Sequence, residues 1–173
     1  MNLELRALSI NDEEAFNKGL ELFSDMDADW YSFLYKEGMP FKEQLKLLED
    51  NFHGRNLKEG RVPDSMLYAF LDGVVVGRSS IRHSLNDFLL NRGGNIGYAV
   101  ATTYRNRGIA TQIIKLSLDY CKNVLKLKKV LITCGEANVG SYKAIEKNGG
   151  ILENILSFPD EEEKVRRYWI EIN

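Results

Sequence analysis

Apolar positions along the chain recur with two spacings, about two residues in some segments and about 3.6 residues in others. Alternation and short apolar runs predict strands over Leu3–Leu8, Met66–Leu71, Val74–Ile81, the residues from Gly93-Gly94 through Val100, Lys129–Cys134, Ile151–Leu156 and Val165–Ile172. Helical spacing predicts helices after Asn11, over Phe41–Phe52, after Gly108 and over Asn138–Asn148. The order β-α-α-β-β-β-α-β-α-β-β is typical of an α/β fold with a mixed sheet, and we expect one domain over residues 1–173.

Local signals mark several ends of these elements. Asn11 is expected to cap the first helix, with Glu14 completing a capping box three residues later. Asp72-Gly73 is a strong hairpin signal between two of the strands. Gly149-Gly150 is expected to stop the last helix.

Composition and charge narrow the class of protein. With 44% hydrophobic residues, the chain can form a single hydrophobic core. Its net charge of −2 argues against a nucleic-acid-binding protein, which would carry an excess of basic residues. Cys121 and Cys134 form no CxxC motif or Cys/His cluster, so neither a disulfide framework nor a metal site is expected. The start MNLELRALSI has no leader pattern and no apolar run is long enough for a membrane span, so we expect a cytoplasmic protein without a membrane partner.

The stretch Ile96–Thr111 combines an apolar strand, a basic turn and a glycine that opens a helix. Positive side chains at a helix N-terminus oppose the helix dipole by about 0.3–1 kcal/mol each. Arg105 and Arg107 nevertheless lie there, and no Asp or Glu occurs from Phe88 to Leu118. A bound anion would resolve this conflict, because the amides of the first helical turn have no partner within the helix. The pattern therefore predicts a phosphate site.

The turn also carries a motif. The residues Arg105-Asn106-Arg107-Gly108-Ile109-Ala110 fit the pattern R/Q-x-x-G-x-G/A, and a second strand-to-helix unit begins Asn138-x-x-Ser141. Over Gly94–Gly150 the chain thus resembles the GNAT superfamily of acetyl-CoA-dependent N-acetyltransferases. The resemblance implies the family's acyl-CoA N-acyltransferase fold, acetyl-CoA as co-substrate, and transfer of the acetyl group to a primary amine of a small molecule or peptide by direct attack on the thioester. Two other hypotheses stay open, a coenzyme A-binding module without turnover and a non-enzymatic α/β interaction domain.

Each matched residue has an expected task. Gly108 and Ala110 are small enough for the backbone to approach a pyrophosphate. The successive amides of Asn106, Arg107, Gly108, Ile109, Ala110 and Thr111 would form an anion-binding concavity, and the side chains of Arg105 and Arg107 would add charge. The resemblance assigns backbone contacts with the pantetheine arm to Tyr98, Ala99 and Val100, and a side-chain hydrogen bond with it to Asn138. It places Ser141 at a small-residue position of the cofactor-binding site. The alternatives are a solvated surface turn, a helix N-cap for Asn138 and a helix-surface position for Ser141.

The catalytic groups are less clear from the sequence. Many family members carry a tyrosine acid and a glutamate base at the positions that Ile145 and Asn95 occupy here. Candidates to replace them are Tyr142, one turn before Ile145, Glu136 beyond a strand end, and a water held by Asn95. His83 and Tyr98 are further candidates, each with a structural role as the alternative.

The acceptor and the assembly state rest on weaker signals. The segment Asp25–Tyr35 falls where the family binds its acceptor, and its carboxylates beside Trp30 and Tyr31 would attract a cationic amine. A solvated acidic loop is the alternative. Dimers are frequent in such families, so the resemblance leaves a homodimer open.

Overall fold

The computed structural model describes residues 2–23, 31 and 34–172. The strands are β1 Leu3–Arg6, β2 Asp64–Leu71, β3 Val74–Arg82, β4 Ile96–Val100, β5 Lys129–Gly135, β6 Ile151–Leu156 and β7 Val165–Glu171. The helices are α1 Glu13–Leu22, α3 Phe41–Phe52, α4 Ile109–Asn123 and α5 Val139–Lys147. The predicted α/β order is confirmed. No helix within the described part of the chain is long and apolar enough to cross a membrane.

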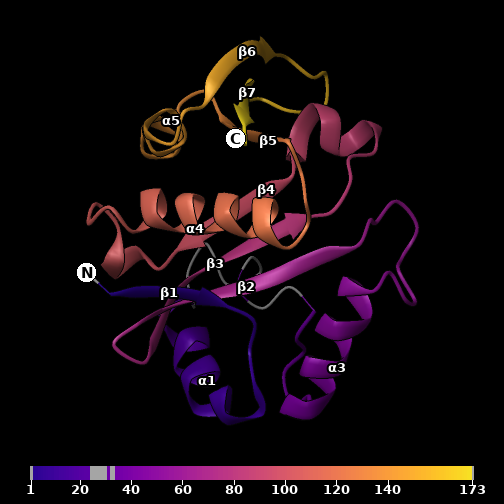
Figure 1. The fold of residues 1–173 in the computed structure, drawn as a ribbon, viewed down its shortest axis with the longest axis vertical. Coiled ribbons are helices and arrows are strands. Elements are labelled where there is room, and N and C mark those ends of the chain that lie inside the picture. The colour runs from indigo at the N-terminus through magenta and orange to yellow at the C-terminus, as the bar shows by residue number, and fades with distance from the viewer. Residues whose placement is uncertain (1, 24–30, 32–33, 173) are drawn as a thin grey trace.

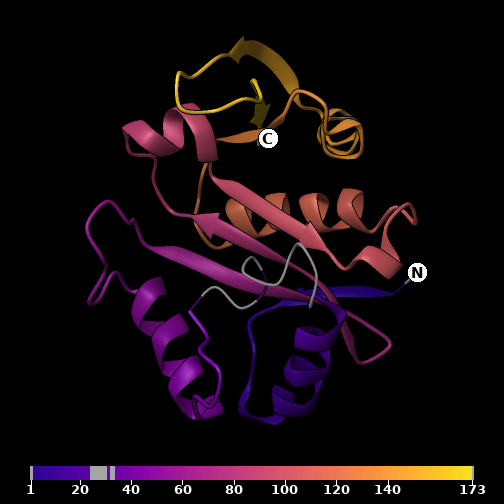
Figure 2. The same ribbon diagram turned by 180° about the vertical axis from the view of Figure 1, so that it is seen from behind.

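Two antiparallel sheets form the framework. The first has the order β1-β2-β3-β4, and the second has the order β5-β7-β6. In Figure 1, α1 and α3 lie on one face of the first sheet, and α4 lies on the other face. Figure 2 shows the same layers from behind, with α5 and the second sheet beyond α4. The sequence motif thus lies in the turn that joins β4 of the first sheet to α4.

Opposite faces of the first sheet bury different kinds of side chain. The α4 face packs aliphatic residues, with Ile113 and Ile114 of the helix fully buried. The face under α1 and α3 carries an aromatic cluster that includes Phe16, Phe23 and Tyr31. Tyr31 is buried, and its hydroxyl donates a hydrogen bond to the carbonyl of Phe16 at 2.7 Å. Tyr31 therefore belongs to the core, and the prediction that it helps to attract a substrate amine is wrong. The aspartates of the segment Asp25–Tyr35 and its Trp30 lie outside the described residues.

The first helix begins differently from its prediction. The expected cap pair Asn11 and Glu14 is wrong, because a short 3-10 turn at Ile10–Asp12 comes before α1. The Asp12 carboxylate accepts bonds from the Ser9 amide at 2.6 Å and from the Arg6 guanidinium at 2.7 and 2.8 Å. This ion pair fastens the turn to the end of β1, which therefore stops before the predicted Leu8.

Strands β4 and β5 touch at one end only. An isolated bridge joins Gly94 to Ile132, and the Asn95 amide donates to the Leu131 carbonyl at 2.7 Å. Gly94 has φ +66°, and a Cβ there would collide with the carbonyl oxygen of Leu131. Glycine is required for this close approach. Beyond the bridge the two strands diverge, and a cavity lies between them.

Candidate functional site

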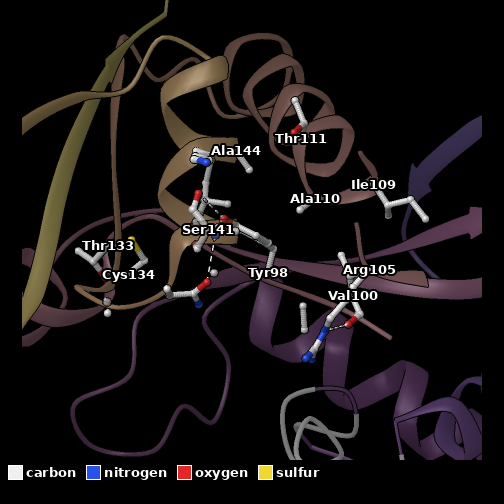
Figure 3. A pocket seen from close by; sticks show the side chains of 18 of the residues that line it. Tyr98, Val100, Arg105, Ile109, Ala110, Thr111, Thr133, Cys134, Ser141 and Ala144 are labelled. Atoms are coloured by element: carbon white, nitrogen blue, oxygen red, sulfur yellow. Dashed lines mark hydrogen bonds between the residues drawn. The ribbon is translucent and has the colours of Figure 1, made fainter. Parts of the chain in front are cut away.

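A cavity of about 900 Å³ extends along the whole of β4. One wall is β4 itself, and the opposite wall consists of Thr133–Gly135 of β5 and one side of α5 along its length. The turn that leads into α4 closes one end, and residues from the end of β3 and the following loop line the other end. Figure 3 shows the side chains of this cavity, with Tyr98 and Ser141 on one side and Arg105 on the other.

The basic turn, residues 105–111, has an open concave backbone. Asn106 and Gly108 have φ values of +60° and +77°, and a Cβ on Gly108 would meet nothing within 4 Å. Gln112 donates the first helical bond to the Gly108 carbonyl at 3.1 Å. The amides of Ile109, Ala110 and Thr111 therefore have no acceptor within α4, and they can bind an anion.

Positive charge surrounds this turn. The Nε of Arg105 donates to the Val100 carbonyl at 3.1 Å, which holds the guanidinium at the end of β4. Lys143 and Lys147 of α5 line the same cavity, and the sequence analysis had not identified them. Their spacing of four residues places both lysines on one face of the helix, and this pattern in the sequence could have indicated a basic helix face. No Asp or Glu lines the cavity among the described residues, so the cavity is suited to an anionic ligand.

The middle of the cavity contains a short polar cluster. The Tyr98 hydroxyl lies 2.6 Å from the Ser141 hydroxyl (Figure 3), and the amide of Ser141 donates to the Asn138 side-chain oxygen at 3.0 Å. Asn138 thus caps α5 and lines the cavity at the same time. Burial raises the pKa of Tyr98 to about 12 and that of the neighbouring Cys134 to about 11. Both groups therefore stay protonated near neutral pH, and both can donate hydrogen bonds.

The structure brings almost all predicted binding residues to this cavity. Lining residues from that set are Tyr98, Ala99, Val100, Arg105, Asn106, Gly108, Ile109, Ala110, Thr111, Asn138 and Ser141. Arg107 is the exception, because its exposed guanidinium lies over the Tyr104 ring at 5.3 Å from the centroid. Its side chain points along the surface of the turn, although its amide remains part of the concave backbone.

The predicted catalytic side chains lie elsewhere. The buried Asn95 accepts from the Leu131 amide at 2.9 Å and donates to the Arg82 carbonyl at 3.2 Å, so its amide group joins β5 to β3. The Tyr142 ring packs under the Arg166 guanidinium at 4.7 Å. None of Asn95, Tyr142 and Glu136 is among the described lining residues. A role of these three residues in catalysis stays a prediction.

Ile145, at the family's acid position, and the candidates Glu136 and His83 also have structural surroundings. Ile145 is fully buried in the core beneath α5. Glu136 forms a long ion pair with Lys164 at 3.9 Å. The His83 Nε2 lies 2.9 Å from the Ser65 hydroxyl, and burial lowers the pKa of the imidazole. No cluster of metal-ligating side chains occurs in the described parts of the chain.

The far end of the cavity has a different character. Arg82, Phe88 and Arg92 line it together with Leu89 and Gly93. Arg92 pairs with Asp160 at 2.7 Å and stacks on the Phe158 ring at 3.9 Å, which holds the loop between β6 and β7 against this end. Ile81 pairs with Ile96 here, at the start of β4. The whole length of β4 therefore separates this end from the basic turn.

Comparisons with known proteins agree with this geometry. A solved ribosomal-protein-S5-alanine acetyltransferase from Vibrio fischeri has a TM-score of 0.70 at 15% identity, over 100% of this chain and 94% of that chain. RimL, a ribosomal L7/L12 alpha-N-protein acetyltransferase in complex with coenzyme A, has a TM-score of 0.65 at 20% identity, over 99% and 95%. A chimera of spermidine N-acetyltransferase SpeG from Vibrio cholerae and hSSAT has a TM-score of 0.65 at 18% identity, over 99% and 96%.

These TM-scores establish a shared fold. A search among curated proteins found no match. The family model of the acetyltransferase (GNAT) domain matches residues 2–151, which include the basic turn, the polar cluster and all of α5. Because that model covers most of the chain and the solved relatives share its fold throughout, this protein belongs to the GNAT family of acetyltransferases.

Proposed function

We propose that this protein transfers the acetyl group of acetyl-CoA to a primary amine of a small molecule or peptide. The observation that carries the proposal is the open, basic cavity between β4 and β5, which begins at the unpaired amides of Ile109, Ala110 and Thr111. Family membership supports coenzyme A as its ligand. RimL, which shares the fold, is a complex with coenzyme A, and this supports the same assignment.

Each part of the cavity has a task in this proposal. The amides of the basic turn bind the diphosphate, because a helix N-terminus favours anions. Arg105, Lys143 and Lys147 add positive charge near the phosphate groups. The backbone of β4 and the free side-chain NH₂ of Asn138 bind the pantetheine arm, which extends along the strand.

The reaction needs no covalent enzyme intermediate. The neutral amine nitrogen attacks the thioester carbonyl carbon, a C–N bond forms, and the C–S bond then breaks with its electron pair leaving on sulfur. The nitrogen loses one proton and the thiolate gains one, so the products are an amide and free coenzyme A. Backbone amides of β4 stabilise the oxyanion of the tetrahedral intermediate.

Tyr98 is the group we assign to the leaving thiolate. Its hydroxyl lines the cavity, bonds to Ser141 and stays protonated, because its pKa is about 12. A thiol has a pKa of about 8.5, so full proton transfer from Tyr98 to the sulfur is unfavourable. Tyr98 therefore stabilises the thiolate as a hydrogen-bond donor, and the proton comes from the acceptor amine.

Calorimetric titration with acetyl-CoA tests the binding half of the proposal. Gly108→Glu places a carboxylate where the diphosphate would lie, and we expect it to abolish measurable binding. Gly60→Glu is the matched control, since Gly60 has the same φ of +77° and an equally open Cβ position outside the cavity. Binding by the control at the level of the unchanged protein isolates the effect of the site. Equal binding by both variants would contradict the placement of the diphosphate.

A coenzyme A-binding module without turnover is the second candidate function. Two observations favour it: the acid position of the family holds the buried Ile145, and Asn95 uses its side chain to join strands. Thiol release measured with and without a panel of amines separates the two candidates. Release that depends on an amine rules out the module, whereas binding without any release rules out the enzyme. A homodimer and a cytoplasmic location remain further proposals.

A further inference from the structure

Arg82 is a partly buried cation that forms no ion pair with a carboxylate among the described residues. It ends β3 and lines the cavity at the end opposite the basic turn. Its Nη1 donates to the Gly93 carbonyl at a long 3.4 Å, and within the described residues no carboxylate forms an ion pair with it. Burial lowers its pKa, which reflects the cost of removing the charge from water. Most of its donors are therefore available to a ligand.

Asp64, the acidic residue that lies opposite Arg82 in the strand register, does not form an ion pair with Arg82. Asp64 pairs with Arg82 across β2 and β3, and its charge acts on Arg82 through space. The buried Asp64 carboxylate, however, accepts a bond from the Ser80 hydroxyl at 2.7 Å and another from the Asn51 side chain. These bonds occupy both oxygens of Asp64, so its charge acts on Arg82 through space and not through an ion pair.

The other cations of the cavity already have tasks. Arg92 is neutralised by Asp160 at 2.7 Å and Glu161 at 3.0 Å. Arg105 and the two lysines of α5 lie toward the basic turn, at the other end of β4. Of the two arginines that line this end among the described residues, Arg82 is thus the one without an ion pair, and the proposed place of the diphosphate at the other end leaves this end to the acceptor. A guanidinium there recognises a planar anion through paired hydrogen bonds.

We infer that the acceptor is a primary amine that also carries a carboxylate, and that Arg82 binds this carboxylate. The inference rests on the proposed acetyl transfer and names its substrate class. The exposed ring of Phe88 lines the same end and would contact the apolar part of the acceptor. A polyamine fits poorly, because its second ammonium would lie beside Arg82 without an acid among the described lining residues. The carboxylate belongs either to a free amino acid or to an acidic peptide near its N-terminus.

Matched pairs of amines test the inference at saturating acetyl-CoA. The panel contains amino acids with their carboxamides, peptides with Asp or Asn at the second position, and spermidine. We expect the carboxylate member of a pair to have the higher kcat/KM. Arg82→Met should lower that value about ten- to hundredfold and leave the uncharged member within about twofold. Arg82→Lys should recover part of the preference. Arg55→Met removes an exposed guanidinium outside the cavity that pairs with Asp50, and it should not change the preference.

The outcomes separate this inference from the function beneath it. A preference for free amino acids or for acidic peptides supports the inference and identifies the source of the carboxylate. Transfer to spermidine, or an equal effect of Arg82→Met on both members of a pair, overturns it while acetyl transfer stands. Failure of the unchanged protein to bind acetyl-CoA in calorimetry overturns both. Circular dichroism confirms that each variant is folded, and partial recovery by the lysine variant separates charge recognition from packing.

Discussion

Replacement of Asn95 by alanine tests whether this residue holds the two sheets together. The side-chain oxygen accepts from the Leu131 amide at 2.9 Å, and the side-chain nitrogen donates to the Arg82 carbonyl at 3.2 Å. Leu131 is fully buried, so its amide would lose its partner with no access to water. A sequence comparison alone would expect catalysis to suffer; the contacts instead predict a loss of stability.

The magnitude follows from these two bonds. Loss of the bond to the Arg82 carbonyl costs about 1 kcal/mol net, and the buried Leu131 amide left unsatisfied costs about 1–3 kcal/mol, so Asn95→Ala should cost about 2–4 kcal/mol in total. A native domain of this kind has about 5–15 kcal/mol of stability, so the variant should still fold. With a urea m-value of about 2 kcal/mol/M, the unfolding midpoint should fall by about 1–2 M.

Urea unfolding followed by tryptophan fluorescence measures this shift. Asn91→Ala is the control, because its side chain makes a single exposed bond to the Asp87 carbonyl, and we expect a shift below about 0.3 M. The decisive comparison pairs the midpoint with amine-dependent turnover. If Asn95→Ala unfolds like the control but loses most of its turnover, the bridging argument is refuted and Asn95 acts in the chemistry.

Two further predictions concern catalysis and pH. Tyr98→Phe should lower kcat about ten- to hundredfold and leave the KM for acetyl-CoA nearly unchanged, because a hydrogen bond to a charged group contributes about 1.5–3 kcal/mol. An unchanged kcat would exclude Tyr98 as the donor to the thiolate. The hydrogen bond from Arg6 holds the pKa of Asp12 below its ordinary value of 3.8. The stabilisation is therefore present above about pH 4 and lost as pH falls toward the lower folded value. In chemical unfolding at a series of pH values, Asp12→Asn should be less stable than the unchanged protein at pH 7, and this difference in unfolding free energy should narrow in acid. The exposed Asp119→Asn is the control and should show no such trend. A difference that stays constant down to pH 2 would contradict the ion pair.

Sequence-level signals worked best where a local rule governs the backbone. The hairpin at Asp72-Gly73, the helix Phe41–Phe52 and the glycine start of α4 all appear as predicted. Each depends on residues close in the chain, such as a turn that needs positive φ or one apolar helix face. The first helix start was mispredicted because Asp12 bonds to Arg6, a contact made only after β1 is in place.

The candidate site divides in the same way. Because a glycine with positive φ and a helix start are local features, the chain order around Gly108 was enough to predict an open turn whose amides have no acceptor within the helix. Which polar side chains face the cavity depends instead on how β4 and β5 meet and then separate. That arrangement turned Asn95 into a link between strands and placed Ile145 in the core. Tyr98 and Ser141 were brought together from distant segments, and Arg82 was left facing the cavity, because burial and partners are properties of the packed sheets and not of spacing along the chain.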